Sequence, residues 1–421
     1  MSQASRTRQI AAAVIGNALE WYDFVVFGFL TVIIAKLFFP DDNEYAALLK
    51  TTATFGVGFF MRPLGGLLLG IYADRHGRKA ALQIIMGMMT VAIAMIAFAP
   101  TYAAIGIAAP ILIVLARLLQ GFATGGEFAI ATSFLVESAP AHRRGFFGSF
   151  QQVGLALAAL GGALAGMFVT TGLTPEQVEA WGWRVPFLFG LLIGPVGLWI
   201  RRHLQETEVF HEARANRPPE ASILALLRGQ QRAVLVTFGL VIGATISYYV
   251  LLVYMPTFAK TQLHISLGDA FTAQVIALSV LTLVIPLVGH LSDLIGRRPP
   301  MLVGNVLLFS SLYPLFQWLQ AEPTFATLAI VQATLCGMLG IIYGSISTAV
   351  TEQFPPGVRS TGLALAYNFA VMLFGGFAQF FVTWLIEATG QSIAAAYYVM
   401  FGAVVGLAAT LAVREPGDSL P

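Results

Sequence analysis

The chain has 421 residues, of which 57% are hydrophobic and only 10% are charged. Soluble proteins carry roughly a quarter charged residues, so this composition excludes a soluble protein and predicts an all-α membrane protein with many spans. The net charge of +2 gives no basis for nucleic-acid binding, and the single cysteine, Cys336, excludes an intrachain disulfide and a thiolate metal cluster. No cleavable signal is expected, because the first hydrophobic stretch is too long for one.

Hydropathy predicts twelve transmembrane helices in two pseudo-symmetric six-helix bundles. The first six are expected near 9–39, 46–72, 79–99, 105–137, 143–172 and 183–202, and the last six near 230–259, 268–293, 299–320, 325–353, 358–388 and 392–413. The most charged stretch of the chain lies between the two sets. We therefore expect an N-terminal bundle at 1–203, a cytoplasmic inter-bundle loop at 204–229 and a C-terminal bundle at 230–421.

The distribution of lysine and arginine predicts the orientation in the membrane. If the N-terminus is inside, most of these residues fall on the inner side, and the outer side receives only Lys36, Lys50, Arg184 and Lys260. Both termini are therefore predicted to be cytoplasmic.

A loop motif occurs once in each half of the chain. Gly70-Ile-Tyr-Ala-Asp-Arg-His-Gly-Arg-Lys79 follows the second span, and Gly289-His-Leu-Ser-Asp-Leu-Ile-Gly-Arg-Arg298 follows the eighth. A second repeated pair lies after spans four and ten. The duplication favours an internal repeat over an ordinary basic loop. We assign its charged residues to gating, since such pairs can form in one conformation and break in another: Asp74, Arg78, Asp293, Arg297, Glu137, Arg144, Glu352 and Arg359.

This organisation resembles the major facilitator superfamily. Within it, five stretches resemble the metabolite–proton symporter family: GNALEWYDFVVFG at 16–28, FMRPLGG at 60–66, RLLQGFATGGE at 117–127, WGWRVPF at 181–187 and LQETEVF at 204–210. The resemblance implies proton-coupled uptake of citrate, tricarballylate, dicarboxylates, shikimate, or zwitterions such as proline and betaine. The run from Phe38 to Gly70 looks most similar to the citrate and tricarballylate members. The resemblance to the family also implies a monomer in a bacterial inner membrane.

Five charged residues fall at membrane depth away from the helix ends, and all are in the first half: Glu20, Asp23, Arg62, Arg117 and Glu127. A charge at the bilayer centre costs roughly 2.5–3.5 kcal/mol on insertion scales, and is tolerated when it is paired or faces a cavity. Because the equivalent positions of the second half are uncharged, the cluster indicates one specialised site.

Asp23 and Arg117 are expected near the middle of the first and fourth spans. Sugar–proton symporters of the same superfamily have an aspartate and an arginine at what look like the same positions, which implies a proton-coupling pair. In this interpretation Arg117 holds ionised Asp23, and is released to attract an anionic substrate when Asp23 takes up a proton. A static buried ion pair is the alternative.

The fourth span places polar side chains on one face and two glycines on the next. The polar face holds Arg117, Gln120, Thr124 and Glu127. Gly121 and Gly125 suit close packing against another helix. Glu127 is either a second proton site or the partner of a residue in the first span.

Glu20 and Asn17 lie one and two turns inward of Asp23. They either extend a proton path toward the cytoplasm or form a local hydrogen-bonded network. Tyr22 is a candidate substrate ligand, whereas helix packing is favoured for Trp21.

Arg62 either contacts the substrate or anchors the second span to a neighbour, because a guanidinium can bind a carboxylate with two parallel hydrogen bonds. Hydroxyl and amide side chains are expected to complete the cavity: Gln151, Gln152, Tyr248, Tyr343, Tyr367 and Asn368. For each of these, packing or a hydrogen bond to a neighbouring helix is the favoured alternative.

We expect a proton-coupled importer of citrate or a related tricarboxylate that works by alternating access. Its partners are then the organic anion, protons and the lipid bilayer. Another metabolite substrate, a proton-coupled drug exporter, and a receptor or enzyme with a transporter-like body are the alternatives. No metal site, cofactor or catalytic constellation is apparent, so an enzyme is not expected.

Overall fold

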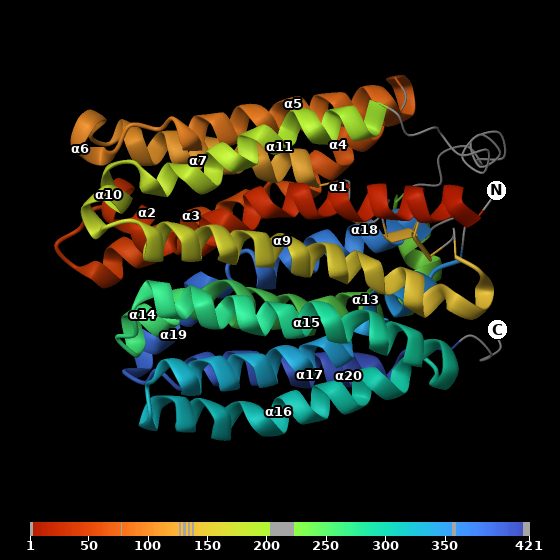
Figure 1. Cartoon of the computed structure of the whole chain (residues 1–421). Helices are drawn as coiled ribbons and strands as arrows, with labels where there is room; N and C mark the ends of the chain where they lie inside the picture. The colour runs from red at the N-terminus through yellow and green to blue at the C-terminus, as the bar shows by residue number, and fades with distance from the viewer. Residues whose placement is uncertain are drawn as a thin grey trace.

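The computed structural model describes residues 3–76, 78–125, 128, 132–133, 135–136, 139–202, 223–355 and 359–415, in some helical stretches by their backbone alone. All regular elements in these ranges are helices (Figure 1). The first half contains α1 (Gln3–Phe29), α2 (Thr31–Phe38), α3 (Glu44–Phe60), α4 (Arg62–His76), α5 (Arg78–Ala97), α6 (Tyr102–Ile105), α7 (Ala108–Thr124), η1 (Ala141–Arg143), α9 (Arg144–Gly172), α10 (Pro175–Ala180), η2 (Gly182–Arg184) and α11 (Val185–Arg202).

The second half contains α13 (Ile223–Ser247), η3 (Tyr248–Tyr254), α14 (Met255–Gln262), α15 (Leu267–Ile295), α16 (Arg298–Ala321), α17 (Phe325–Glu352), α18 (Arg359–Ala370), η4 (Val371–Gly375), α19 (Ala378–Thr389) and α20 (Ala394–Leu411). Among the described residues, eight helices are long and apolar enough to span a membrane, and the bent pair α1–α2 is a ninth candidate. Three shorter apolar helices, at 84–97, 108–124 and 182–192, occupy three further predicted spans.

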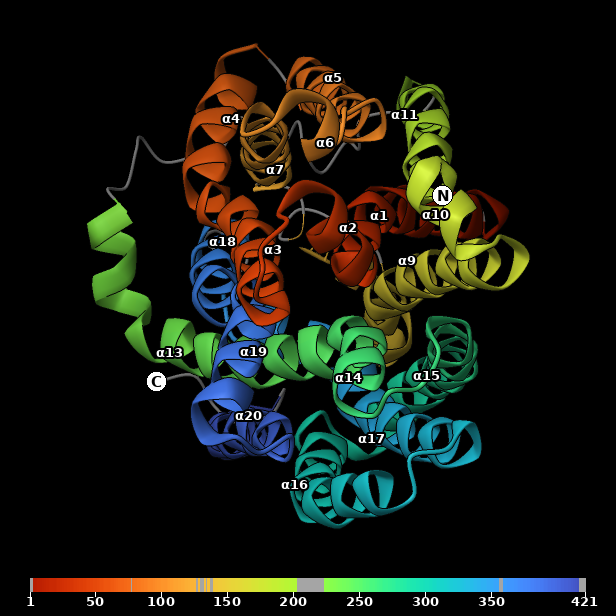
Figure 2. The same ribbon diagram turned by 90° about the vertical axis from the view of Figure 1, so that its left-hand side faces the viewer.

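The two halves lie side by side with their long helices roughly parallel (Figures 1 and 2). The N-terminus, the C-terminus and the start of α9 lie at one end of the bundle, which we call the terminus end. The short helices α6 and α10 lie at the opposite end, which we call the loop end.

Several predicted spans are interrupted. The expected continuous span at 9–39 is wrong, because the chain bends by 63° between Phe29 and Thr31. The seventh span begins at Ile223 instead of 230 and is kinked at Gln230, so the end of the predicted inter-bundle loop is helical. The π-helices η3 and η4 interrupt the seventh and eleventh spans.

Pro256 gives a physical reason for the irregular seventh span. Proline has no N–H, so it cannot donate to the carbonyl of Leu252 four residues earlier. The side-chain amide of Gln274 on α15 donates to that carbonyl instead, at 2.8 Å, and accepts at 2.9 Å from Gln332 on α17. Three helices of the second half are thereby joined at the π-helix.

Glycines allow close packing of α7 against α3 and α4. A Cβ on Gly121 would lie 1.5 Å from the carbonyl oxygen of Gly58, and one on Gly125 would lie 2.1 Å from that of Arg62. Any side chain would separate these backbones. The expected packing role of Gly121 and Gly125 is confirmed.

The two halves touch at both ends of the bundle. At the terminus end, α9 meets α15 so closely that a Cβ on Gly145 would lie 2.6 Å from the carbonyl oxygen of Gly289. At the loop end, the Thr31 hydroxyl donates to Gln379 at 3.3 Å, and Gly28 lies against Val253. The space between the halves is therefore restricted from both ends.

Candidate substrate cavity and proton site

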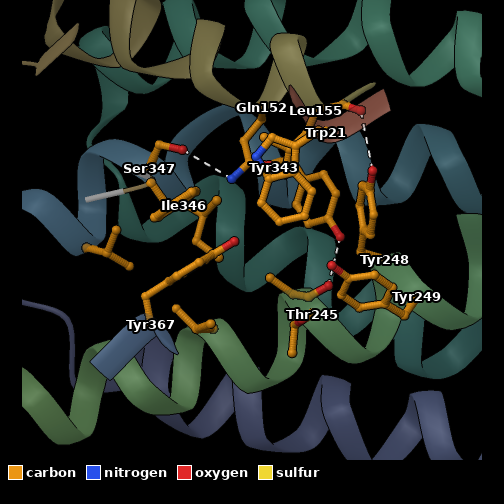
Figure 3. A pocket seen from close by; sticks show the side chains of 14 residues that line it. Trp21, Gln152, Leu155, Thr245, Tyr248, Tyr249, Tyr343, Ile346, Ser347 and Tyr367 are labelled. Atoms are coloured by element: carbon orange, nitrogen blue, oxygen red, sulfur yellow. Dashed lines mark hydrogen bonds between the residues drawn. The ribbon is translucent and has the colours of Figure 1, made fainter. Parts of the chain in front are cut away.

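A cavity lies between the two halves, with an empty volume of about 490 Å³ that includes space open to solvent. Figure 3 shows aromatic rings around it from both halves. Its lining consists of Trp21, Phe128, Gln152, Leu155, Val241, Ala244, Thr245, Tyr248, Tyr249, Tyr343, Ile346, Ser347, Val350 and Tyr367. This mainly apolar surface with a few hydroxyl and amide groups is typical of a small-molecule site.

Four predicted ligands line the cavity: Gln152, Tyr248, Tyr343 and Tyr367. Two predictions about α1 are reversed. Trp21, expected to be a packing residue, lines the cavity, whereas the Tyr22 hydroxyl donates to the carbonyl of Pro186 on α11 at 3.1 Å. Successive residues of a helix point about 100° apart, and here Trp21 faces the cavity while Tyr22 faces α11.

Most polar groups of the cavity already have partners within the protein. The hydroxyl of Tyr343 donates to the carbonyl of Ala244 at 2.8 Å, and the amide of Gln152 donates to Ser347 across the two halves at 3.2 Å (Figure 3). These bonds hold the side chains in place before a ligand arrives.

Arg117 is fully buried on α7 and has neutral partners. Its guanidinium donates to Gln120 at 2.8 Å and to the carbonyl of Phe55 at 3.3 Å. It also stands 4.1 Å from the ring centre of Phe24 and 4.8 Å from that of Phe27. No described carboxylate forms an ion pair with it. The described groups around this charge are therefore dipoles and ring faces.

Arg62 is 2% exposed and also lies near the Phe24 ring. Its guanidinium is 4.8 Å from the ring centre of Trp21 and 5.1 Å from that of Phe24, and its Nε donates to Thr124 at 3.3 Å. Tyr367, which lines the cavity from the second half, is also a neighbour. Arg62 thus lies directly behind two aromatic residues of the lining, and Arg117 lies one layer further back, against Phe24.

Asp23 is 4% exposed and does not pair with Arg117 in this conformation. The expected ion pair is absent, because α1 turns Phe24 and Phe27 toward Arg117 and directs Asp23 to α11. The carboxyl oxygen Oδ1 is buried without a hydrogen-bond partner, and a Cβ on Gly190 would lie 1.8 Å from it.

The other predicted polar residues contact the protein and do not line the cavity. Gln151 donates to Asn17 at 3.3 Å, which joins α9 to α1. Asn368 donates to the carbonyl of Gly125 at 2.7 Å, which joins the two halves. Glu127 lies outside the described residues, and the Glu20 side chain is not described, so their predicted roles stay predictions.

Of the gating residues, Asp293 has the fullest set of contacts. Its carboxylate accepts backbone N–H groups of Gly145 and Phe146, at the start of α9, at 2.7 and 2.9 Å. Arg297 also donates to it at 2.8 Å and bridges to Glu352 at 3.3 Å. A carboxylate at a helix N-terminus satisfies free N–H groups and complements the helix dipole, so Asp293 fastens the two halves together at the terminus end.

Burial alone would lower the pKa of Arg297, but the nearby carboxylates of Glu352 and Asp293 raise it above its usual value. The guanidinium therefore stays charged. The other gating residues are less informative: Arg359 donates to the carbonyls of Thr351 and Phe354, and the Arg144 carbonyl accepts from Thr348. Glu137 lies outside the described residues, as do the side chains of Asp74 and Arg78.

Residues that sequence reasoning missed include Tyr249, Thr245 and Gly190. Tyr249 packs on Phe55 and Phe59 of the first half, with ring centres 5.8 and 5.2 Å apart. The adjacent residues Tyr248 and Tyr249 in the sequence could have indicated that this part of the seventh span faces the cavity. No group of three or more potential metal ligands occurs among the described residues.

Helices long enough to span a membrane, arranged in two halves around a mainly apolar cavity with a few polar groups, are typical of a membrane transporter. The chain belongs to the Sugar (and other) transporter family, whose model matches residues 9–211 and 199–415. It is thus a member of the major facilitator superfamily and not an enzyme, as predicted.

Curated relatives match nearly the whole chain. The citrate-proton symporter of Salmonella typhi is 36% identical, over 97% of this chain and 94% of that protein. The alpha-ketoglutarate permease of Escherichia coli is 36% identical over 98% and 94%, and the proline/betaine transporter of the same organism is 34% identical over 98% and 84%.

Among solved structures, the chain resembles a partially occluded, inward-open conformation of the E. coli xylose transporter. The TM-score is 0.80 at 18% identity, and the match covers all of both chains. This likeness supports the fold.

Proposed function

We propose that this protein is a proton-coupled importer of a small organic anion, with citrate or a related tricarboxylate as substrate. The observation that carries the proposal is Arg117, a buried cation whose described partners are all neutral. An anion that enters the adjacent cavity supplies the missing negative charge. The names of the relatives, citrate-proton symporters among them, support the same class.

Proton coupling is assigned to Asp23. A buried carboxyl group without a charged partner is more stable as the neutral acid, whereas an ionised one requires a cation or water. Binding of a proton leaves Arg117 free for the anionic substrate. Loss of the proton on the inner side would draw the carboxylate toward Arg117 and weaken the hold on the substrate.

The terminus end is assigned to the cytoplasm of a bacterial inner membrane. The lysine and arginine distribution supports this orientation, with both termini inside. The two halves correspond to the bundles 1–203 and 230–421, which alternate in access about the cavity. One copy of the chain contains a complete cavity, so a monomer suffices for transport.

The test is uptake of radiolabelled citrate into proteoliposomes, with and without an inward proton gradient, and with a protonophore control. Tricarballylate, succinate, shikimate, proline and betaine serve as competitors. Gradient-driven accumulation of citrate that is inhibited by competing tricarballylate supports the proposal. Efflux in place of uptake would favour a drug exporter, and binding without any flux would favour a receptor.

A zwitterion such as betaine or proline is the second candidate. The specific observation in its favour is the cavity lining, in which six aromatic residues and no charged side chain occur. Aromatic faces attract quaternary ammonium groups. If betaine is taken up and citrate does not compete with it, the substrate is a zwitterion and not a tricarboxylate, and the assignment as a symporter stands.

A further inference from the structure

Asp23 lies in a contact between α1 and α11, outside the lining of the cavity. The Tyr22 hydroxyl bonds to the Pro186 carbonyl, and its ring lies edge-on to Phe189, with ring centres 5.6 Å apart. Gly190 is the next residue on α11. Both contacts are made by Tyr22, and they hold α1 and α11 together next to the Asp23 carboxyl group.

Gly190 leaves the space that the carboxyl group fills. A Cβ at this position would lie 1.8 Å from Oδ1 and 3.0 Å from the Cγ of Asp23. Any residue other than glycine would therefore force the carboxyl group out of its present rotamer. Oδ1 has no hydrogen-bond partner here, and the surroundings of this oxygen suit a neutral acid.

Few charged or titratable groups face Asp23. Its own helix offers Tyr22, already bonded to Pro186; the Glu20 side chain is not described. The titratable residues of α11 are Arg201 and Arg202, at its far end, whose side chains are not described, and α9 has only Arg144, at its first position. The titratable side chains described on α2, α3, α4, α7 and η3 are Lys36, Glu44, Tyr45, Lys50, Arg62, Tyr72, Arg117, Tyr248, Tyr249 and Tyr254.

We propose that Gly190 is a positioning residue for proton coupling: it provides a niche in which the protonated Asp23 carboxyl group is held away from Arg117. This inference rests on the proposed role of Asp23. The niche separates two states of the carboxyl group. As a neutral acid it rests against Gly190, and as an anion it must leave this apolar site and approach a cation. Proton affinity is then set by the balance between the niche and Arg117.

The test is the infrared band of the protonated Asp23 carboxyl group, identified by its loss in Asp23→Asn and titrated with pH in the reconstituted protein without substrate. Gly190→Ala closes the niche, so the midpoint should fall by about one pH unit or more, a tenfold loss of proton affinity. Gly194→Ala, one turn further along α11, is the matched control, because a Cβ there meets the side chain of Thr90 on α5 and not Asp23.

An unchanged midpoint in Gly190→Ala would overturn the niche. Should that variant not fold, Asp23→Glu decides the question: its longer side chain cannot fit the niche, so its midpoint should also lie below that of the wild-type carboxyl group, and an equal midpoint overturns the proposal.

The two proposals fail separately. A shifted midpoint together with no proton-driven uptake of any solute would keep the niche and remove the symporter function. Proton-driven uptake with an unshifted midpoint would keep the symporter function and remove the niche.

Discussion

The fastening of the two halves by Asp293 permits a quantitative prediction for Asp293→Asn. The carboxylate accepts two backbone N–H groups of α9 and one from Arg297, at 2.7–2.9 Å. Asparagine keeps one oxygen and turns an NH₂ group toward a former donor. Loss of one charge-assisted hydrogen bond costs about 1.5–3 kcal/mol, and loss of the charge at the helix N-terminus about 0.3–1 kcal/mol.

The combined loss of about 2–4 kcal/mol should shift the equilibrium away from the state closed at the terminus end by about 30- to 700-fold, since about 1.4 kcal/mol is a factor of ten. The assay is maleimide labelling of Ser347→Cys, a buried residue of the cavity, with Cys336→Ser removing the native thiol. Inside-out membrane vesicles should label at least tenfold faster when Asp293→Asn is present.

Asp269→Asn is the matched control, because it makes the same change at the other end of α15, where the carboxylate accepts from the Ser266 hydroxyl. Labelling of Asp293→Asn at the rate of this control would refute the fastening role. Faster labelling only from right-side-out vesicles would reverse the proposed orientation.

Three further changes test other contacts. Arg117→Ala should abolish uptake of an anionic substrate in proteoliposomes, because it removes the buried cation; normal uptake would make Arg117 part of the scaffold. Asp23→Asn should abolish gradient-driven accumulation but leave exchange, and accumulation at the wild-type level would exclude Asp23 from coupling. Gln274→Leu leaves the carbonyl of Leu252 without its donor, at a cost of about 1–3 kcal/mol. Its Tm in detergent should fall, whereas exposed Gln317→Leu should leave the Tm unchanged.

The approximate positions of the spans could be predicted because a run of apolar residues long enough to cross a membrane is visible in the sequence itself. The interruptions could not. The π-helix before Pro256 depends on which distant side chain supplies a hydrogen bond, as Gln274 does for Leu252. Such partners are brought together only by the packed fold.

The candidate site shows the same division. That Asp23 and Arg117 are buried could be predicted from their positions within apolar spans. The direction in which each points could not, because the rotation of α1 about its own axis is set by packing against α9 and α11. This rotation decides that Trp21 lines the cavity and that Asp23 meets Gly190.

The buried ions and the cavity hydroxyls belong to different halves. Asp23, Arg62 and Arg117 come from α1, α4 and α7, whereas the four tyrosines of the cavity come from η3, α17 and α18. In the proposed function, the proton site and both buried guanidinium groups thus lie in the first half, whereas the hydroxyl groups that line the cavity lie in the second. A chimera that exchanges the second half is therefore expected to change the hydroxyl groups offered to the solute and to keep Asp23, Arg62 and Arg117.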